Sequence, residues 1–183
     1  TLFRSGTVAW SQTAYDFIRN SSTPDSANPS LWRNTELNSL YGLFEVVDGV
    51  YQVRGYDVAN VTFVKSDNGW IVFDCTTSSE TAKAALELLE SKFGKAHIAA
   101  VVVSHAHIDH YGGIGGLIDE KNVADSSLPL DEQIKSGKTL IIVPEGYEKA
   151  VMEENVFAGN AMKRRTNFQY GSLLDKGGKG SLS

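Results

Sequence analysis

The chain has 183 residues, 42% of them apolar, which is enough for one soluble domain with a buried core. Its 17 basic and 22 acidic residues give a formal net charge of −5, and this balance excludes a general nucleic-acid binder, which needs a basic face. No apolar run approaches the roughly 20 residues of a transmembrane segment, and the single cysteine excludes an internal disulfide.

Residues 1–40 are expected to form an N-terminal arm, with an irregular stretch from Ser21 to Ser30. The chain begins with Thr1 and shows no clear signal peptide between Thr1 and Trp10. We therefore expect the true N-terminus to be missing. The compartment stays open, a secreted or periplasmic location included.

Three short strands are predicted next, at Val50–Val53, Val58–Lys65 and Trp70–Phe73. Lys65–Gly69 reads as the hairpin turn between the last two strands. The segment Thr81–Phe93 carries apolar residues at spacings of three and four, which predicts a helix with one apolar stripe.

The run from Ser104 to Gly113 packs three of the four histidines and a carboxylate into six residues. It follows Ile98–Val103, an apolar run typical of a strand buried on both faces. In extended chain, side chains two apart point the same way, so His105 and His107 can close on one ion. A glycine turn would aim Asp109 and His110 at a second point. Imidazole and carboxylate are zinc ligands, so the run predicts a paired metal centre.

Two other interpretations of this run exist: a chance cluster of surface histidines, and a metal-scavenging site without catalysis. The context of a strand followed by a glycine turn favours the catalytic interpretation. Leu117–Lys121 is expected to start a helix, Thr139–Val143 to form another buried strand, and Glu148–Glu154 to form a helix.

The histidine run resembles the metal-binding signature of the metallo-β-lactamase superfamily. Three longer segments, Asn28–Arg33, Gly42–Gly55 and Glu154–Arg165, resemble its linear alkylsulfatase branch. The resemblance implies an α/β fold, the metallo-β-lactamase-like αβ/βα sandwich, with only its N-terminal half present. Residues 41–183 would form a partial catalytic domain truncated at its C-terminus.

The resemblance also implies zinc-dependent hydrolysis of alkyl sulfate esters, such as the detergent dodecyl sulfate, to an alcohol and sulfate by a metal-bound hydroxide. Two Zn²⁺ ions would be held by His105, His107, Asp109 and His110 together with ligands beyond Ser183, and Asp109 would orient the hydroxide. The full-length protein would be a homodimer. Because those further ligands are missing, we expect this segment alone to be inactive.

An anionic sulfate ester needs positive partners, and Asn160, Arg164 and Arg165 are candidates for substrate binding. A basic run of this kind is also typical of a solvated helix face. In the superfamily, an aspartate at the position of Asp74 lies beneath the metal loop and would accept a hydrogen bond from it. Alternatively, Asp74 caps the helix that begins near Ser78. Cys75 is interpreted as a buried structural thiol.

Two alternatives to alkyl sulfate hydrolysis remain. The same metal loop serves hydrolysis of lactams, thioesters and phosphodiesters, and only the flanking segments favour sulfate esters. The chain could also be a truncated, non-catalytic metal-binding fragment. Alkyl chain preference, primary or secondary esters, and C–O or S–O cleavage stay undecided.

Overall fold

The computed structural model describes residues 2–4 and 6–173. Contacts within the chain divide it into two units, Thr1–Val143 and Pro144–Ser183. The boundary that we expected from the sequence, at residue 40, stays a prediction.

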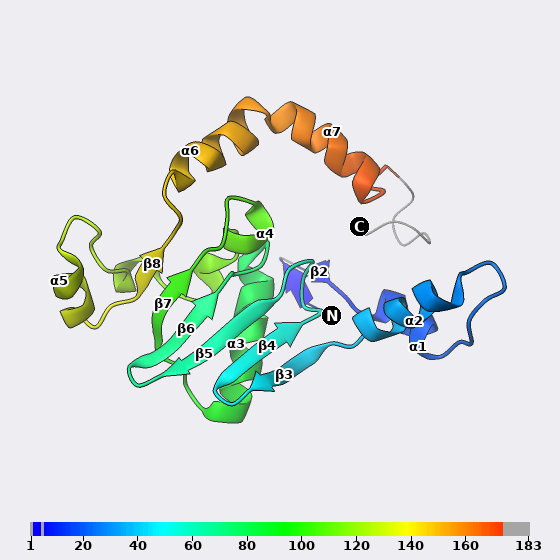
Figure 1. Cartoon of the computed structure of the whole chain (residues 1–183), viewed down its shortest axis with the longest axis horizontal. Helices are drawn as coiled ribbons and strands as arrows, with labels where there is room; N and C mark the ends of the chain where they lie inside the picture. Colours follow the sequence, from blue (N-terminus) through cyan, green and yellow to red (C-terminus); the bar gives the residue numbers. More distant parts are fainter. Residues whose placement is uncertain (1, 5, 174–183) are drawn as a thin grey trace. The chain divides into compact units, whose positions relative to one another are not determined.

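The first unit is built on a mixed six-stranded sheet in which neighbours in sequence are neighbours in space (Figure 1). The strands are β3 (Gly42–Val47), β4 (Val50–Arg54), β5 (Val61–Ser66), β6 (Gly69–Phe73), β7 (Ile98–Val102) and β8 (Leu140–Ile142). Strands β3 to β6 pair antiparallel, whereas β6, β7 and β8 pair parallel. A parallel pair needs a crossover, and α3 (Ser79–Phe93) supplies the crossover between β6 and β7.

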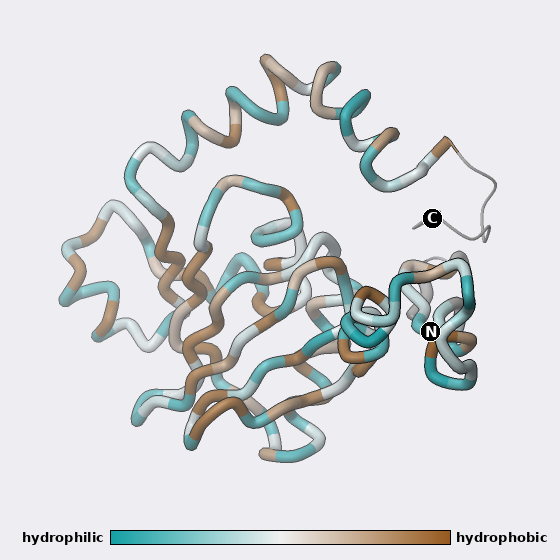
Figure 2. Tube along the Cα trace, turned by 45° about the vertical axis from the view of Figure 1, so that its right-hand side comes forward, coloured by the Kyte–Doolittle hydropathy of each residue, from teal (hydrophilic) through white to brown (hydrophobic). Residues whose placement is uncertain are grey.

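The core of this unit follows the alternation of buried residues along the strands. Val53, Phe63 and Val72 are almost fully buried, as are Ala85 and Leu89 of α3, which lies against one face of the sheet (Figure 1). In Figure 2 the strands carry long hydrophobic stretches and the turns between them are more hydrophilic. Burying large aliphatic and aromatic side chains contributes about 1.5–3 kcal/mol each, so this layer holds the fold together.

Shorter elements complete the first unit. Its N-terminal part contains β1 (Leu2–Arg4), β2 (Thr7–Trp10), η1 (Thr13–Tyr15), α1 (Asp16–Arg19) and α2 (Pro29–Asn38). Between β7 and β8 lie α4 (Ile108–Tyr111), η2 (Ile114–Gly116), η3 (Glu120–Asn122) and α5 (Leu130–Lys135). The stretch predicted as irregular, Ser21–Ser30, has no regular element up to Asn28, and the rest of the predicted arm includes the ten-residue helix α2, which is capped by the Asn28 side chain.

The second unit contains α6 (Tyr147–Met152), a π-helical turn η4 (Glu153–Phe157) and α7 (Gly159–Gln169). The helix expected at Glu148–Glu154 thus begins one residue earlier and widens into the π turn. In the part of the chain that the structure describes, no helix is both long and apolar enough to span a bilayer.

The mixed α/β fold with a central sheet is confirmed, and the predicted strands and the helix at Thr81–Phe93 are present with small shifts. The strand predicted at Thr139–Val143 was expected to be buried, which is wrong, because β8 lies at the edge of the sheet and Ile141 and Ile142 are 42% and 46% exposed. Strand β3 was not predicted separately. The strand expected from Val58 starts at Val61, because the residues before it form a loop around the buried Asp57.

The helix expected at Leu117–Lys121 is wrong, since this stretch forms no α-helix but leads from the 3₁₀ turn η2 into the 3₁₀ turn η3. A Cβ on Gly116 would lie 2.1 Å from the carbonyl oxygen of Ser79, so the backbone here is pressed against the start of α3. Asp119 is extended (φ −82°, ψ 142°), which interrupts any helix. Tertiary contact overrides the local preference.

Candidate metal centre

The histidine run begins immediately after β7, at the carboxyl end of the parallel strand pair β6–β7 (Figure 1). His105 and His107 precede α4, whose N-cap is His107, and Asp109 and His110 lie on its single turn. His105 and Ala106 form a bend, and His107 is extended (φ −77°, ψ 142°) before the chain turns into α4, so the straight stretch expected through both histidines is not present.

The three imidazole rings of this run lie together. The ring centroids of His105 and His110 are 4.0 Å apart, and those of His105 and His107 are 4.6 Å apart. Two pairs of donor atoms result: His105 Nε2 is 2.9 Å from His107 Nδ1, and Asp109 Oδ2 is 3.2 Å from His110 Nε2.

These distances suit zinc. Zn–N and Zn–O bonds of about 2.0–2.1 Å in tetrahedral geometry place two ligand atoms about 3.3 Å apart. The Asp109–His110 pair has this separation, and the His105–His107 pair is a few tenths of an ångström tighter. Among the described residues, no group of three or more His, Cys, Asp or Glu side chains forms a ready-made site. The residues present therefore offer a metal only pairs of donor atoms, and a bound ion would need further ligands.

Asp74 lies directly beneath this loop. Its carboxylate accepts hydrogen bonds from the backbone N–H of Ser104 (2.8 Å) and the Ser104 hydroxyl (2.9 Å), and its Oδ2 is 2.8 Å from His110 Nδ1. A carboxylate at this distance holds the proton on Nδ1, which leaves Nε2 of His110 with the lone pair that a metal requires. Helix α3 is capped by Ser78 rather than by Asp74.

Ser104 fixes the tautomer of His105 in the same way as Asp74 fixes that of His110. Its hydroxyl donates to Asp74 and lies 2.9 Å from His105 Nδ1. With its own proton on Asp74, the hydroxyl oxygen accepts from Nδ1–H of His105. The lone pair of His105 then lies on Nε2, the atom that faces His107. One carboxylate and one hydroxyl thus fix two tautomers.

The segment that carries Asp74 has an unusual backbone. Asp74 (φ 59°) and Thr76 (φ 63°) are the non-glycine residues with positive φ in the described chain. The left-handed conformation is tolerated by Asp but is a genuine outlier for a β-branched residue such as Thr. Conformations of this kind cost about 1–3 kcal/mol each and persist where surrounding contacts enforce them, often at functional sites.

The ligand loop is packed against this strained segment backbone to backbone. Cys75 N donates to the carbonyl of His110 (2.9 Å), and Gly113 N donates to the carbonyl of Thr76 (2.9 Å). A Cβ on Gly113 would lie 1.9 Å from the Cys75 carbonyl oxygen. Glycine is required here so that the two backbones can meet.

Cys75 is fully buried. Burial and, to a smaller extent, the neighbouring charge of Asp74 raise the pKa of its thiol to about 12. A thiol that stays protonated is a poor ligand and nucleophile, which agrees with its interpretation as a structural residue.

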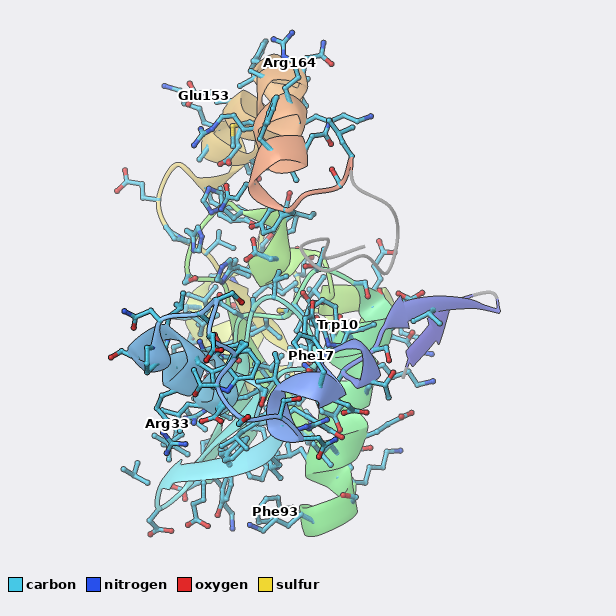
Figure 3. All side chains as sticks on the ribbon, turned by 90° about the vertical axis from the view of Figure 1, so that its right-hand side faces the viewer. Trp10, Phe17, Arg33, Phe93, Glu153 and Arg164 are labelled. Atoms are coloured by element: carbon cyan, nitrogen blue, oxygen red, sulfur yellow. The ribbon has the colours of Figure 1, made fainter. Side chains whose placement is uncertain are left out.

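The predicted substrate-binding residues, Asn160, Arg164 and Arg165, all lie on α7 and are exposed. Figure 3 shows the Arg164 side chain pointing away from the helix. They belong to the second unit, and their role in substrate binding stays a prediction.

Residues 54–144 match the metallo-β-lactamase superfamily. With its mixed sheet, its crossover helix and the histidine run at the end of β7, the chain belongs to this superfamily and carries part of its domain.

The relatives that match nearly the whole of this chain include alkylsulfatases. The chain is 44% identical over 178 residues to a linear primary-alkylsulfatase from Pseudomonas sp., which covers 97% of this chain and 25% of that protein. It is 41% identical to an (R)-specific secondary-alkylsulfatase from Pseudomonas sp., with the same coverage.

A solved structure, the stereoselective inverting sec-alkylsulfatase Pisa1 from Pseudomonas sp., superposes with a TM-score of 0.78 at 41% identity, covering 94% of this chain and 26% of that one. The chain thus spans about a quarter of the length of the relatives it matches. The resemblance predicted from the sequence is confirmed.

Sequence reasoning missed Ser104 as a participant in the site. Its position directly before His105 was a signal, since a hydroxyl at the end of a strand is well placed to bond a neighbouring carboxylate. The left-handed Thr76 and the buried Asp57 gave no signal in the sequence.

Proposed function

We propose that the protein hydrolyses alkyl sulfate esters at a site that holds two zinc ions. One observation carries the metal part: at the end of β7 four side chains offer two pairs of donor atoms, with separations of 2.9 and 3.2 Å. The sulfate-ester part rests on the 38–44% identity to alkylsulfatases over 97% of this chain.

Zinc would supply Lewis acidity and a nucleophile derived from water near neutral pH. The chain's own residues would bind and orient. His105 and His107 form one half-site, and Asp109 and His110 form the other. Asp74 keeps the Nδ1 proton on His110, so that the ring presents one fixed nitrogen to the metal.

Substrate recognition is assigned to α7. A sulfate ester carries one negative charge, and Arg164 and Arg165 can donate charge-assisted hydrogen bonds to its oxygens. Asn160, two turns or fewer from both arginines on the same helix, can add an amide donor. The homodimer and the zinc identity of the metal belong to the same proposal.

The experiment is sulfate release from dodecyl sulfate by the protein expressed from its complete reading frame, loaded with zinc. His107→Ala removes one proposed ligand. His97→Ala is the matched control, because His97 is an exposed histidine outside the ligand loop. We expect release by the wild type and by H97A, and loss in H107A.

Two outcomes would count against the proposal. A folded, zinc-loaded protein that releases no sulfate would contradict the substrate, and turnover of a lactam, thioester or phosphodiester in its place would assign another substrate to the same site. Undiminished sulfate release by H107A would show that the hydrolysis does not depend on this loop.

A further inference from the structure

Asp57 is a buried acidic residue outside the ligand loop, in the connection between β4 and β5, and it is 8% exposed. Its carboxylate accepts four hydrogen bonds from three residues. Val58 N (2.7 Å) and Thr77 Oγ1 (2.7 Å) donate to Oδ1, while Thr77 N (3.1 Å) and Thr81 Oγ1 (2.7 Å) donate to Oδ2.

All four donors are neutral groups, and no ion pair of Asp57 occurs among the residues that the structure describes. Burying a carboxylate without a cation is costly unless hydrogen bonds replace the lost water. The bonds from Thr77 and Thr81, 20 and 24 residues away in sequence, therefore tie the β4–β5 connection to the start of α3.

These bonds hold the residues next to the strained backbone. Thr77 is fixed at both its backbone N–H and its hydroxyl, directly after Thr76 in its left-handed conformation. The Thr76 hydroxyl in turn lies 2.8 Å from that of Thr81, which donates to Asp57. Asp57 thus restrains Thr76 from two sides.

The restrained segment is the one that contacts the ligand loop. The carbonyl of Thr76 accepts from Gly113 N, and Cys75 N donates to the carbonyl of His110. Asp74, two residues before Thr76, accepts from Ser104 and bonds His110 Nδ1. A relaxation of Thr76 towards an ordinary conformation would move the partners of His110 on both its side chain and its carbonyl.

We propose that Asp57 is a positioning residue of the metal centre, which acts through the segment Asp74–Thr77 on His110 and on the turn at Gly113. The inference rests on the proposed metal site and assigns Asp57 no contact with metal or substrate. Removal of its acceptor oxygen leaves the ligands in place but loosens the backbone that orients them.

The test measures Co²⁺ and Zn²⁺ binding by the protein from its complete reading frame, with the Co²⁺ absorption spectrum as a report on ligand geometry. We expect Asp57→Asn to weaken binding about tenfold, the lower end of the range for residues that support metal ligands, and to change the spectrum. Thr81→Val, a milder change, should weaken binding in the same sense, and Thr81→Ser should restore it. The double variant D57N/T81V should lose little more than D57N, because both remove one network.

Two controls separate positioning from stability. Asp67→Asn makes the same chemical change at an exposed turn and should bind metal as the wild type does. Leu89→Ala lowers stability from the fully buried core of α3 and should keep the wild-type affinity and spectrum.

Wild-type affinity and spectrum in both D57N and T81V would overturn the inference, and so would an equal loss in Leu89→Ala. Metal binding is measured without substrate. A failure to release sulfate would therefore contradict the proposed function but would not change the result for Asp57.

Discussion

The sheet and α3 of the first unit bury large apolar side chains, whereas the helices of the second unit bury none of theirs. Phe63, Val72 and Leu89 of the first unit are fully buried, whereas α6, η4 and α7 contain no buried residue. Large apolar side chains of the second unit stay open to solvent: Phe157 is 81% exposed and Phe168 84%.

This difference in burial decides how firmly the side chains of each unit are positioned. In the first unit Asp74, 36 residues away in sequence, bonds His110 directly and reaches His105 through Ser104, so the orientation of these two rings is a consequence of tertiary packing. The helices of the second unit are six and eleven residues long, and helices shorter than about 12–15 residues are marginal in water by themselves. Their local structure places Arg164 and Arg165 on one helix, where both side chains are exposed.

The largest effect is expected from Gly113→Ala. A Cβ there would meet the Cys75 carbonyl at 1.9 Å and the Ser78 carbonyl at 2.6 Å, so the ligand loop must separate from the strained segment. Backbone clashes exceed ordinary overpacking, and we expect a loss of about 4 kcal/mol or a failure to fold. Urea unfolding measures this loss.

Gly159→Ala in α7 is the counterpart, because nothing lies within 4 Å of its Cβ position. Alanine is the better helix former, so stability should stay level or rise by up to about 1 kcal/mol. An equal loss in both variants would erase the contrast between the two units.

Leu89→Ala should come next, with a loss of about 3 kcal/mol, within the 2–5 kcal/mol typical of a buried leucine. Phe168→Ala removes a larger side chain that is 84% exposed and should change stability by less than about 0.5 kcal/mol. Thermal or urea unfolding of the two variants checks the pair. A large loss in Phe168→Ala would show that α7 is packed after all.

Asp74→Asn tests the tautomer argument. An amide cannot hold the Nδ1 proton of His110 as a carboxylate does, so zinc affinity should fall about 10–100-fold. Isothermal titration with zinc measures this, with Asp67→Asn as the control for the same change at an exposed position. Unchanged affinity would assign Asp74 to folding alone.

The smallest effect concerns pH and Cys75. The pKa of its thiol is about 12 in the folded protein, raised by burial from an ordinary value of 9.0. The folded state therefore keeps a proton that the unfolded state releases, so stability is full below pH 9 and declines as pH rises from 9 towards 12.

Between pH 8 and pH 10 this decline should amount to about 1.4 kcal/mol in wild type relative to Cys75→Ala. Urea unfolding of both proteins at the two pH values measures it, and parallel pH profiles would refute it. Consistently, the native thiol should resist alkylation at pH 8 until the protein unfolds.

Local patterns predicted the strands near Val50, Trp70 and Ile98 and the helix ending at Phe93, because alternation and three–four spacing are properties of short segments. They failed at Leu117–Lys121, where close contact between Gly116 and Ser79 decides the conformation. Alternation and spacing can be read from a short segment of sequence, whereas the contact between Gly116 and Ser79 forms only in the folded chain.

By itself, the sequence predicted which side chains would bind metal, because six consecutive residues directly after a predicted strand carry three histidines and a carboxylate. Tertiary structure decided how those side chains are held. The bond from His110 to Asp74 spans 36 residues, and that from Thr81 to Asp57 spans 24. The left-handed conformations of Asp74 and Thr76 are locally unfavourable, so only these distant contacts can impose them.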